Sequence, residues 1–188
     1  MGTAPRVAAL LLLLASTGAF AGPKDEVKAA LDKFVAARSY HVTMSHSGAQ
    51  AMTTEADFVA PDRFRMTMPM GTQYIIGDTM YMNMQGRSMK VPMGKGTMTQ
   101  WRDPANLAKH EATMTVKALG SEAIGGKPAK KYAMSNTQPQ PSASTMWVGS
   151  DGYPLQIRVD SNVQGKPVTT TIRYSRFNDP TIRIEPPQ

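Results

Sequence analysis

The chain has 188 residues, a formal net charge of +7 and no cysteine. Without cysteine the fold must rely on burial and hydrogen bonds instead of disulfides. We also expect no bacterial lipid anchor on the mature N-terminus, because that anchor is attached to a cysteine. The Lys and Arg residues are scattered singly apart from Lys130-Lys131, so we expect no nucleic-acid-binding arm and no nucleic-acid partner.

The first residues have the pattern of a secretory signal peptide. Arg6 precedes the apolar stretch "VAALLLLLASTGAF", and Ala19-Phe20-Ala21 forms an A-x-A cleavage site. An uncleaved membrane anchor is the alternative, but the apolar stretch has about 14 residues where a membrane-spanning helix needs about 20. We therefore expect a signal peptide at residues 1–21, and a single domain at 22–188 that is a soluble periplasmic monomer after cleavage.

An amphipathic helix is expected over residues 25–38, "DEVKAALDKFVAAR". Its apolar residues recur at intervals of three and four, which places them along one stripe of a helix. This stripe contains Val27, Ala30, Leu31, Phe34 and Val35. Asp25 suits the N-cap or the first turn, where a carboxylate accepts backbone N–H groups.

After this helix the apolar period changes from 3.6 to 2, which is typical of half-buried strands. One strand face holds Tyr40, Val42 and Met44, and a second holds Thr54, Ala56 and Phe58. Further strands are indicated by the alternation near 114–118, 130–135, 144–148, 155–159 and 168–174. A short helix should begin at Asp103, as N-cap, with Pro104 at the first helical position.

Nine methionines lie between Met66 and Met98. Many of them form same-face rows on two strands, and a Gly77-Asp78 turn precedes the second row. The rows are Phe64, Met66, Met68 and Met70, then Met80, Met82 and Met84. Thioethers are soft ligands for Cu(I), and they are also adaptable apolar filler. Both interpretations are consistent with this region.

So many consecutive antiparallel strands in one domain must curl, because a flat open sheet leaves a face and both edges unprotected. We expect an α+β, mainly β fold. It should be a strongly curved antiparallel sheet, an incomplete barrel of about ten strands, whose concave side is covered by the N-terminal amphipathic helix and a short second helix.

Catalytic and histidine-based metal motifs are absent from the sequence. It has no thiol, no H-E-x-x-H and no G-x-S-x-G, so we expect no enzyme, no catalytic residue and no cofactor. In "HVTMSH", His41 and His46 are five residues apart and should face opposite sides of a strand. We therefore expect no metal site, with methionine-based Cu(I) binding as the alternative.

The order of several segments resembles the LolA-like family, the lipoprotein carriers and LppX/LprG-type lipid binders. They are "VKAALDKFVAARSYHVTM", "FVAPDRFRMTM", "YIIGDTMYMNM", "ALGSEAIGGKPAKKYAM", "MWVGSDGYPLQIRV" and "YSRFNDPTIRIEPP". The resemblance implies an incomplete barrel with helices as a lid, enclosing an apolar cavity for acyl chains. The methionine-rich lining departs from the family pattern. The lid-tethering arginine of the lipoprotein carriers matches no single residue, and the candidates are Arg38, Arg63 and Arg65.

The pattern and the resemblance together predict a non-catalytic periplasmic carrier or chaperone that binds the acyl chains of a lipid or lipoprotein, with an envelope membrane partner as a further candidate. We expect the cavity to be lined by Met44, Phe58, Phe64, Met66, Met68, Met70, Ile76, Met80, Met82, Met84 and Met146, with Val27, Leu31 and Phe34 as its lid. The alternatives are a periplasmic Cu(I)-binding protein and an envelope protein-interaction module with a filled core.

Overall fold

The structure, a computed structural model, describes residues 21–48, 51–69, 71–84, 87–137, 141–163 and 165–186. Its helical elements are α1 (Pro23–Ala36), the 3-10 turn η1 (Gln100–Arg102) and α2 (Pro104–Thr113). Its strands are β1 (Ser39–His46), β2 (Met52–Val59), β3 (Arg63–Met68), β4 (Gly71–Ile76), β5 (Thr79–Met84), β6 (Arg87–Pro92), β7 (Thr115–Ile124), β8 (Lys127–Asn136), β9 (Ser142–Gly149), β10 (Pro154–Val163) and β11 (Lys166–Ser175). The predicted signal peptide falls almost entirely outside the described residues and stays a prediction.

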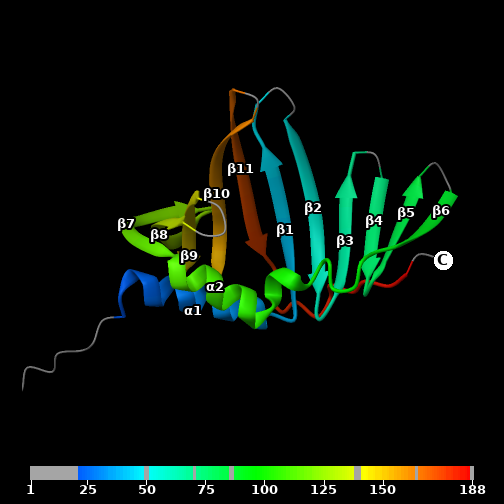
Figure 1. The fold of residues 1–188 in the computed structure, drawn as a ribbon, viewed down its shortest axis with the longest axis horizontal. Coiled ribbons are helices and arrows are strands. Elements are labelled where there is room, and N and C mark those ends of the chain that lie inside the picture. Colours follow the sequence, from blue (N-terminus) through cyan, green and yellow to red (C-terminus); the bar gives the residue numbers. More distant parts are fainter. Residues whose placement is uncertain are drawn as a thin grey trace, which may run out of the picture.

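The strands form one eleven-stranded sheet in the order β6-β5-β4-β3-β2-β1-β11-β10-β9-β8-β7. All neighbours are antiparallel, and β1 joins the two halves by pairing with both β2 and β11. In the described part of the chain β6 and β7 are the two edges, so the sheet curves without closing (Figure 1). The expected incomplete barrel is confirmed, with eleven strands in place of about ten.

The N-terminal helix begins two residues earlier than predicted and ends two residues earlier, at Ala36. Its first turn explains the shift, because Pro23 occupies the first helical position, where its missing N–H costs nothing. The Asp25 carboxylate then accepts a hydrogen bond from the Gly22 N–H at 3.1 Å. Asp25 therefore stabilises the first turn and is not the N-cap residue.

The second helix begins as predicted. The Asp103 carboxylate accepts hydrogen bonds from the N–H groups of Ala105 at 2.8 Å and Asn106 at 3.4 Å, and Pro104 follows it as the first helical residue. Figure 1 shows α1 and α2 lying across the lower ends of the strands, while β1, β2 and β11 extend well beyond them. The helices therefore cover only part of one sheet face.

The buried stripe of α1 packs against that face in two places. Val27 and Ala30 lie in a buried cluster with Tyr132 and Met146, from β8 and β9. Phe34 lies in a second cluster, rich in aromatic residues, with its ring centre 4.9 Å from that of Tyr40 and 4.9 Å from that of Tyr174. This second cluster contains Phe34, Ala37, Tyr40, Phe58, Phe64 and Ile75. The helix is thus anchored at both ends by packing.

Candidate ligand-binding face

Cross-strand pairing gathers the expected cavity residues on one face of the sheet. Phe58 on β2 lies opposite Phe64 on β3, and Phe64 lies opposite Ile75 on β4. Ile75 in turn lies opposite Met80 on β5. Directly opposite residues share a sheet face, and along one strand every second residue does so. Phe34 of α1 packs on this face, which we call the inner face.

Five further members of the predicted set lie on the inner face as well. Met66 and Met68 are two and four residues from Phe64, and Met82 is two residues from Met80. Met44 and Met146 belong to one row of directly opposite residues that crosses four strands, from β1 to β9. The row consists of Met44, Ile172, Ile157 and Met146. The period-two pattern of the sequence therefore predicted correctly that these residues share one face of the sheet.

The prediction that Ile76 lines the cavity was wrong. Ile76 lies opposite Arg63 and Thr79, on the outer face, and its neighbour Ile75 takes the inner position, where it is 1% exposed. The strand "GTQYII" ends in two apolar residues, so its pattern does not say which of them turns inward. Met70 lies outside the described residues, and Met84 is placed by its backbone opposite Arg87 at the end of the β5–β6 pair.

The inner face becomes less covered with distance from the helices. Met44, Met66, Met68, Met80 and Met82 are all partly buried. Further out on the same face, Met89 opposite Met82 is 52% exposed and Met52 opposite His46 is 44% exposed. Sequence reasoning missed both of these, although Met89 continues the alternation of "SMKVPM". The result is a methionine-rich apolar surface on β1 to β6 that the helices leave partly open.

The predicted lid residues all lie between α1 and the sheet. Val27 is 0% exposed and Phe34 is 9% exposed, so both belong to the packed core. Leu31 is partly buried and packs against the cluster that contains Val27. Of the three, Leu31 is therefore the residue whose side chain is partly exposed. Whether the stripe acts as a lid over a ligand stays a prediction.

An arginine that the sequence did not single out connects the helices to the inner face. Arg102 in η1 donates hydrogen bonds to the carbonyl oxygens of Val35 and Ala37, at the C-terminal end of α1. Burial lowers the pKa of Arg102, against the opposing effect of Tyr40. The signal that could have identified it is its position just before the predicted Asp103 cap.

The sequence candidates for that tethering role have other partners. Arg63 donates to the carbonyl oxygen of Ile184 at 2.9 Å, and Arg65 donates to the carboxylate of Asp57. Arg38 follows the end of α1, and its backbone N–H donates to Asn178 Oδ1 at 2.8 Å. The contact between η1 and α1 could therefore not be predicted from residues that are close together in the sequence.

The two strand histidines face opposite sides, as their spacing predicted. His41 Nδ1 lies 2.8 Å from Asp57 Oδ1 on the outer face. His46 Nδ1 lies 2.9 Å from Thr170 Oγ1, on the inner face. Among the described residues, no group of three His, Asp or Glu side chains is placed to hold a metal ion.

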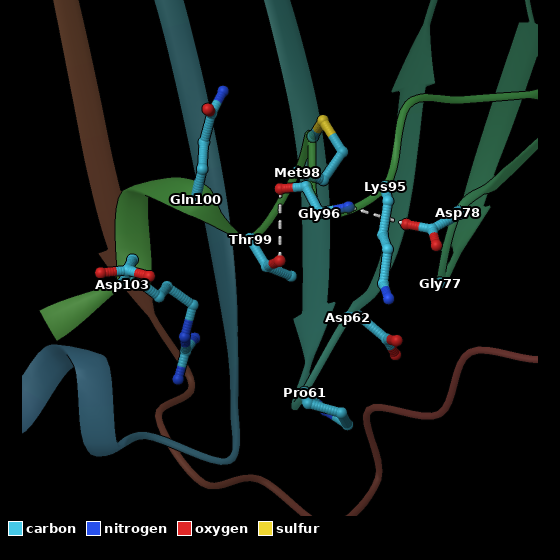
Figure 2. A pocket seen from close by; sticks show the side chains of 11 residues that line it. Pro61, Asp62, Gly77, Asp78, Lys95, Gly96, Met98, Thr99, Gln100 and Asp103 are labelled. Carbon is cyan, nitrogen blue, oxygen red and sulfur yellow. Dashed lines mark hydrogen bonds between the residues drawn. The ribbon is translucent and has the colours of Figure 1, made fainter. Parts of the chain in front are cut away.

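A pocket of about 590 Å³ adjoins the lower edge of the inner face. Its walls are the β2–β3 turn with Asp62, the β4–β5 turn with Asp78, and the loop from Lys95 to Asp103 (Figure 2). Met98 lines this pocket and also packs against the aromatic cluster of the inner face. Most residues that line the pocket have polar side chains, whereas the adjoining face is apolar.

Comparisons with known proteins bear on the fold. No protein-family model matches the chain, and no curated protein sequence matches it. Among solved structures, LppX of Mycobacterium tuberculosis, a lipoprotein, superposes with a TM-score of 0.61 at 15% identity, over 85% of this chain and 96% of LppX. LprF from Mycobacterium bovis gives a TM-score of 0.64 at 12% identity, over 87% of this chain and 96% of LprF.

MucB gives a TM-score of 0.51 at 16% identity, over 87% of this chain and 60% of MucB. In the described part of this chain, no helix is both long and apolar enough to cross a membrane. The identities are low, so these likenesses concern the course of the backbone and not the chemistry of the site. The chain has the fold of LppX and LprF.

Proposed function

We propose that this protein is a non-catalytic periplasmic carrier that binds the acyl chains of a lipid or lipoprotein on the methionine-rich inner face. The single observation that carries the proposal is an apolar sheet face that the helices cover only partly. Met66, Met68, Met80 and Met82 lie together on it and are partly buried, beside the exposed Met89. An exposed apolar surface of this kind marks an interaction site.

The binding energy would come from burial of the acyl chain. Each CH₂ group removed from water contributes about 0.8 kcal/mol, so a chain of twelve carbons offers ample affinity without any strong polar contact. A carrier also has to release its ligand. Partial coverage by the helices suits that need, because the ligand can leave without unfolding of the sheet.

Methionine gives such a surface a special property. Its unbranched side chain has several rotatable bonds and a polarizable sulfur, so it adapts to ligands of different shape. Branched aliphatic residues in the same positions would favour one ligand shape. We therefore infer that the carrier accepts acyl chains of varied length and unsaturation.

Native mass spectrometry of the protein purified from its own cell envelope tests the proposal. We expect a mass excess that corresponds to a lipid or an acylated peptide. An excess that corresponds to copper would support the alternative of a Cu(I)-binding protein. A protein without added mass that also fails to bind a fluorescent fatty acid would support the third reading, an interaction module.

A matched pair of variants on β3 tests the location of the site. Met68→Glu places a charge on the inner face, whereas Thr67→Glu places the same charge on the exposed outer face of the same strand. Fatty-acid binding should weaken at least about tenfold in Met68→Glu, because a carboxylate in an apolar site loses its hydration. Equal binding by the two variants would place the ligand elsewhere.

A further inference from the structure

The pocket of about 590 Å³ at the lower edge of the inner face has the size of a small-molecule site. We propose that it binds the hydroxyl-bearing, uncharged headgroup of the ligand, such as a sugar or glycerol, while the acyl chains lie on the inner face. The inference rests on the proposed function, because it assigns the polar part of the same ligand.

The pocket walls are held in place by their own hydrogen bonds. The Gly96 N–H donates to Asp78 Oδ1 at 2.9 Å, and the Met93 N–H donates to the Asp78 carbonyl oxygen at 2.8 Å. The Gly77 N–H donates to the Asp62 carbonyl oxygen at 3.2 Å. The first two bonds tie the loop after β6 to the β4–β5 turn, and the third ties that turn to the β2–β3 turn, so the pocket is formed before any ligand arrives.

Several polar groups of the pocket are available to a ligand. Within the described part of the chain, the Asp62 carboxylate makes no hydrogen bond. The Asp78 carboxylate accepts its hydrogen bond from Gly96 through Oδ1, which leaves Oδ2 for a ligand. Lys95 lines the same pocket as these two residues, and Figure 2 shows its side chain on the side of the pocket where Asp62 and Asp78 lie. The pocket therefore presents two carboxylate acceptors and an ammonium donor.

This arrangement selects a class of headgroup. A hydroxyl group can donate to a carboxylate and accept from an ammonium group, so a pair of hydroxyls can use Asp62, Asp78 and Lys95 together. A phosphate would be repelled by the two carboxylates, and an ammonium group would be repelled by Lys95. The other two charged residues of the lining already have partners, since Arg102 donates to the end of α1 and Asp103 caps α2. A neutral polyol satisfies all three groups without burying an unpaired charge.

The position of the pocket connects it to the acyl surface. Met98 forms part of the pocket wall and also packs against the cluster of Phe58, Phe64 and Ile75. Arg102 lines the pocket as well, and its guanidinium lies 4.4 Å from the centre of the Phe58 ring. A ligand can thus place its headgroup among the carboxylates and pass its chain over Met98 onto the inner face.

The test compares three amphiphiles with the same dodecyl chain, namely dodecyl maltoside, dodecanoate and dodecylphosphocholine. Each displaces a fluorescent fatty-acid probe from the mature protein, below the concentration at which it forms micelles. The equal chains cancel the hydrophobic contribution. We expect dodecyl maltoside to displace the probe at a concentration about tenfold lower than the other two, because hydrogen bonds to charged groups add affinity.

The double variant Asp62→Asn with Asp78→Asn keeps the shape of the pocket and removes the two negative charges assigned to the headgroup. We expect the preference for dodecyl maltoside to fall below about threefold, with dodecanoate binding no weaker than in the native protein. The control is Glu55→Gln, which removes a charge from the exposed outer face of β2 and should preserve the preference. An unchanged preference in the double variant, or no preference in the native protein, overturns the headgroup assignment.

Free maltose separates this inference from the proposed function. If dodecanoate binds and the maltoside is not preferred, the proposal of an acyl carrier is supported and the headgroup assignment is contradicted. If maltose binds as tightly as the maltoside, and its affinity falls by the same factor in the double variant, the pocket is supported and the proposal of an acyl carrier is contradicted. Circular dichroism of each variant confirms that it is folded.

Discussion

The guanidinium of Arg102 lies 4.4 Å from the centre of the Phe58 ring, while its Nη2 group donates to the carbonyl oxygens of Val35 and Ala37. One side chain thus joins η1, the C-terminal end of α1 and the inner face. Cations are favourable at helix C-termini and over aromatic rings. Arg102 therefore holds the segment before α2 against the rest of the fold.

The substitution Arg102→Met tests this role, because it keeps an apolar stem over Phe58 and removes the donors. We expect the free energy of unfolding to fall by about 1–3 kcal/mol, as measured by urea denaturation. Hydrogen exchange should accelerate over α2. Arg158→Met is the control, since Arg158 pairs with Asp160 on the surface and should contribute less than about 1 kcal/mol. Equal stability of the two variants would contradict the tethering role.

The lid hypothesis is best tested at Leu31. Phe34 packs in the aromatic cluster, so its replacement by Asp would threaten the fold itself, whereas Leu31 is only partly buried. We expect Leu31→Asp to change fatty-acid affinity at least about fivefold, while the helix content measured by circular dichroism stays near that of the native protein. Asp32→Leu, on the exposed side of α1, serves as the control. Unchanged affinity in a folded Leu31→Asp variant would rule out the lid.

Oxidation offers a test of the methionine surface with internal controls. Mild peroxide should convert Met89 and Met52, which are 52% and 44% exposed, before Met114 and Met146, which are 6% and 0% exposed. Sulfoxides bring polar groups onto the inner face, so we expect fatty-acid binding to fall as Met66, Met68, Met80 and Met82 become oxidised. Peptide mapping by mass spectrometry follows each site. Full oxidation of these four with intact binding would show that they do not face the ligand.

Replacing the same four methionines by leucine should have a different effect. The swaps conserve apolarity and approximate volume, and each typically costs less than about 1.5 kcal/mol. We expect the variant to fold and bind, but to accept a narrower range of acyl chains than the native protein. Titration with saturated and kinked fatty acids measures this range. The same variant serves for Cu(I), where we expect neither protein to take the ion from a strong chelator.

The outer-face pair of Asp57 and Arg65 predicts a pH dependence of stability. Burial alone would raise the pKa of Asp57, but hydrogen bonds from Arg65 and His41 outweigh it and lower that pKa. A depressed folded-state pKa stabilises the protein above the unfolded value of about 3.9, and this stabilisation is lost as the pH falls through the folded value.

Asp57→Asn should therefore lower the free energy of unfolding by about 1–3 kcal/mol at pH 7, and by less at about pH 3, below the unfolded pKa, where protonation of the unfolded state has removed part of this stabilisation. Urea denaturation at both pH values gives the difference. Asp32→Asn is the control, because its exposed pair with Lys28 contributes little. A penalty for Asp57→Asn that is the same at both pH values would mean that the ion pair does not titrate as described.

Local periodicity was enough to predict much of this protein. The stripe of Val27 and Leu31 predicted which side of α1 packs on the sheet, and the alternation around Met66 and Met80 predicted which side of the strands is apolar. The opposite directions of His41 and His46 followed from the same rule. Side-chain direction within one element depends only on backbone geometry, which neighbouring residues determine.

Contacts between distant segments were decided only by the tertiary structure. Ile75 and Ile76 are both apolar, so the pairing with β3 and β5 had to select which of them turns inward. Arg102 reaches the end of α1 from 65 residues or more along the chain, and the polar pocket is assembled from two strand turns and a loop. Such contacts depend on how separate elements pack, and no periodic pattern within one element records that packing.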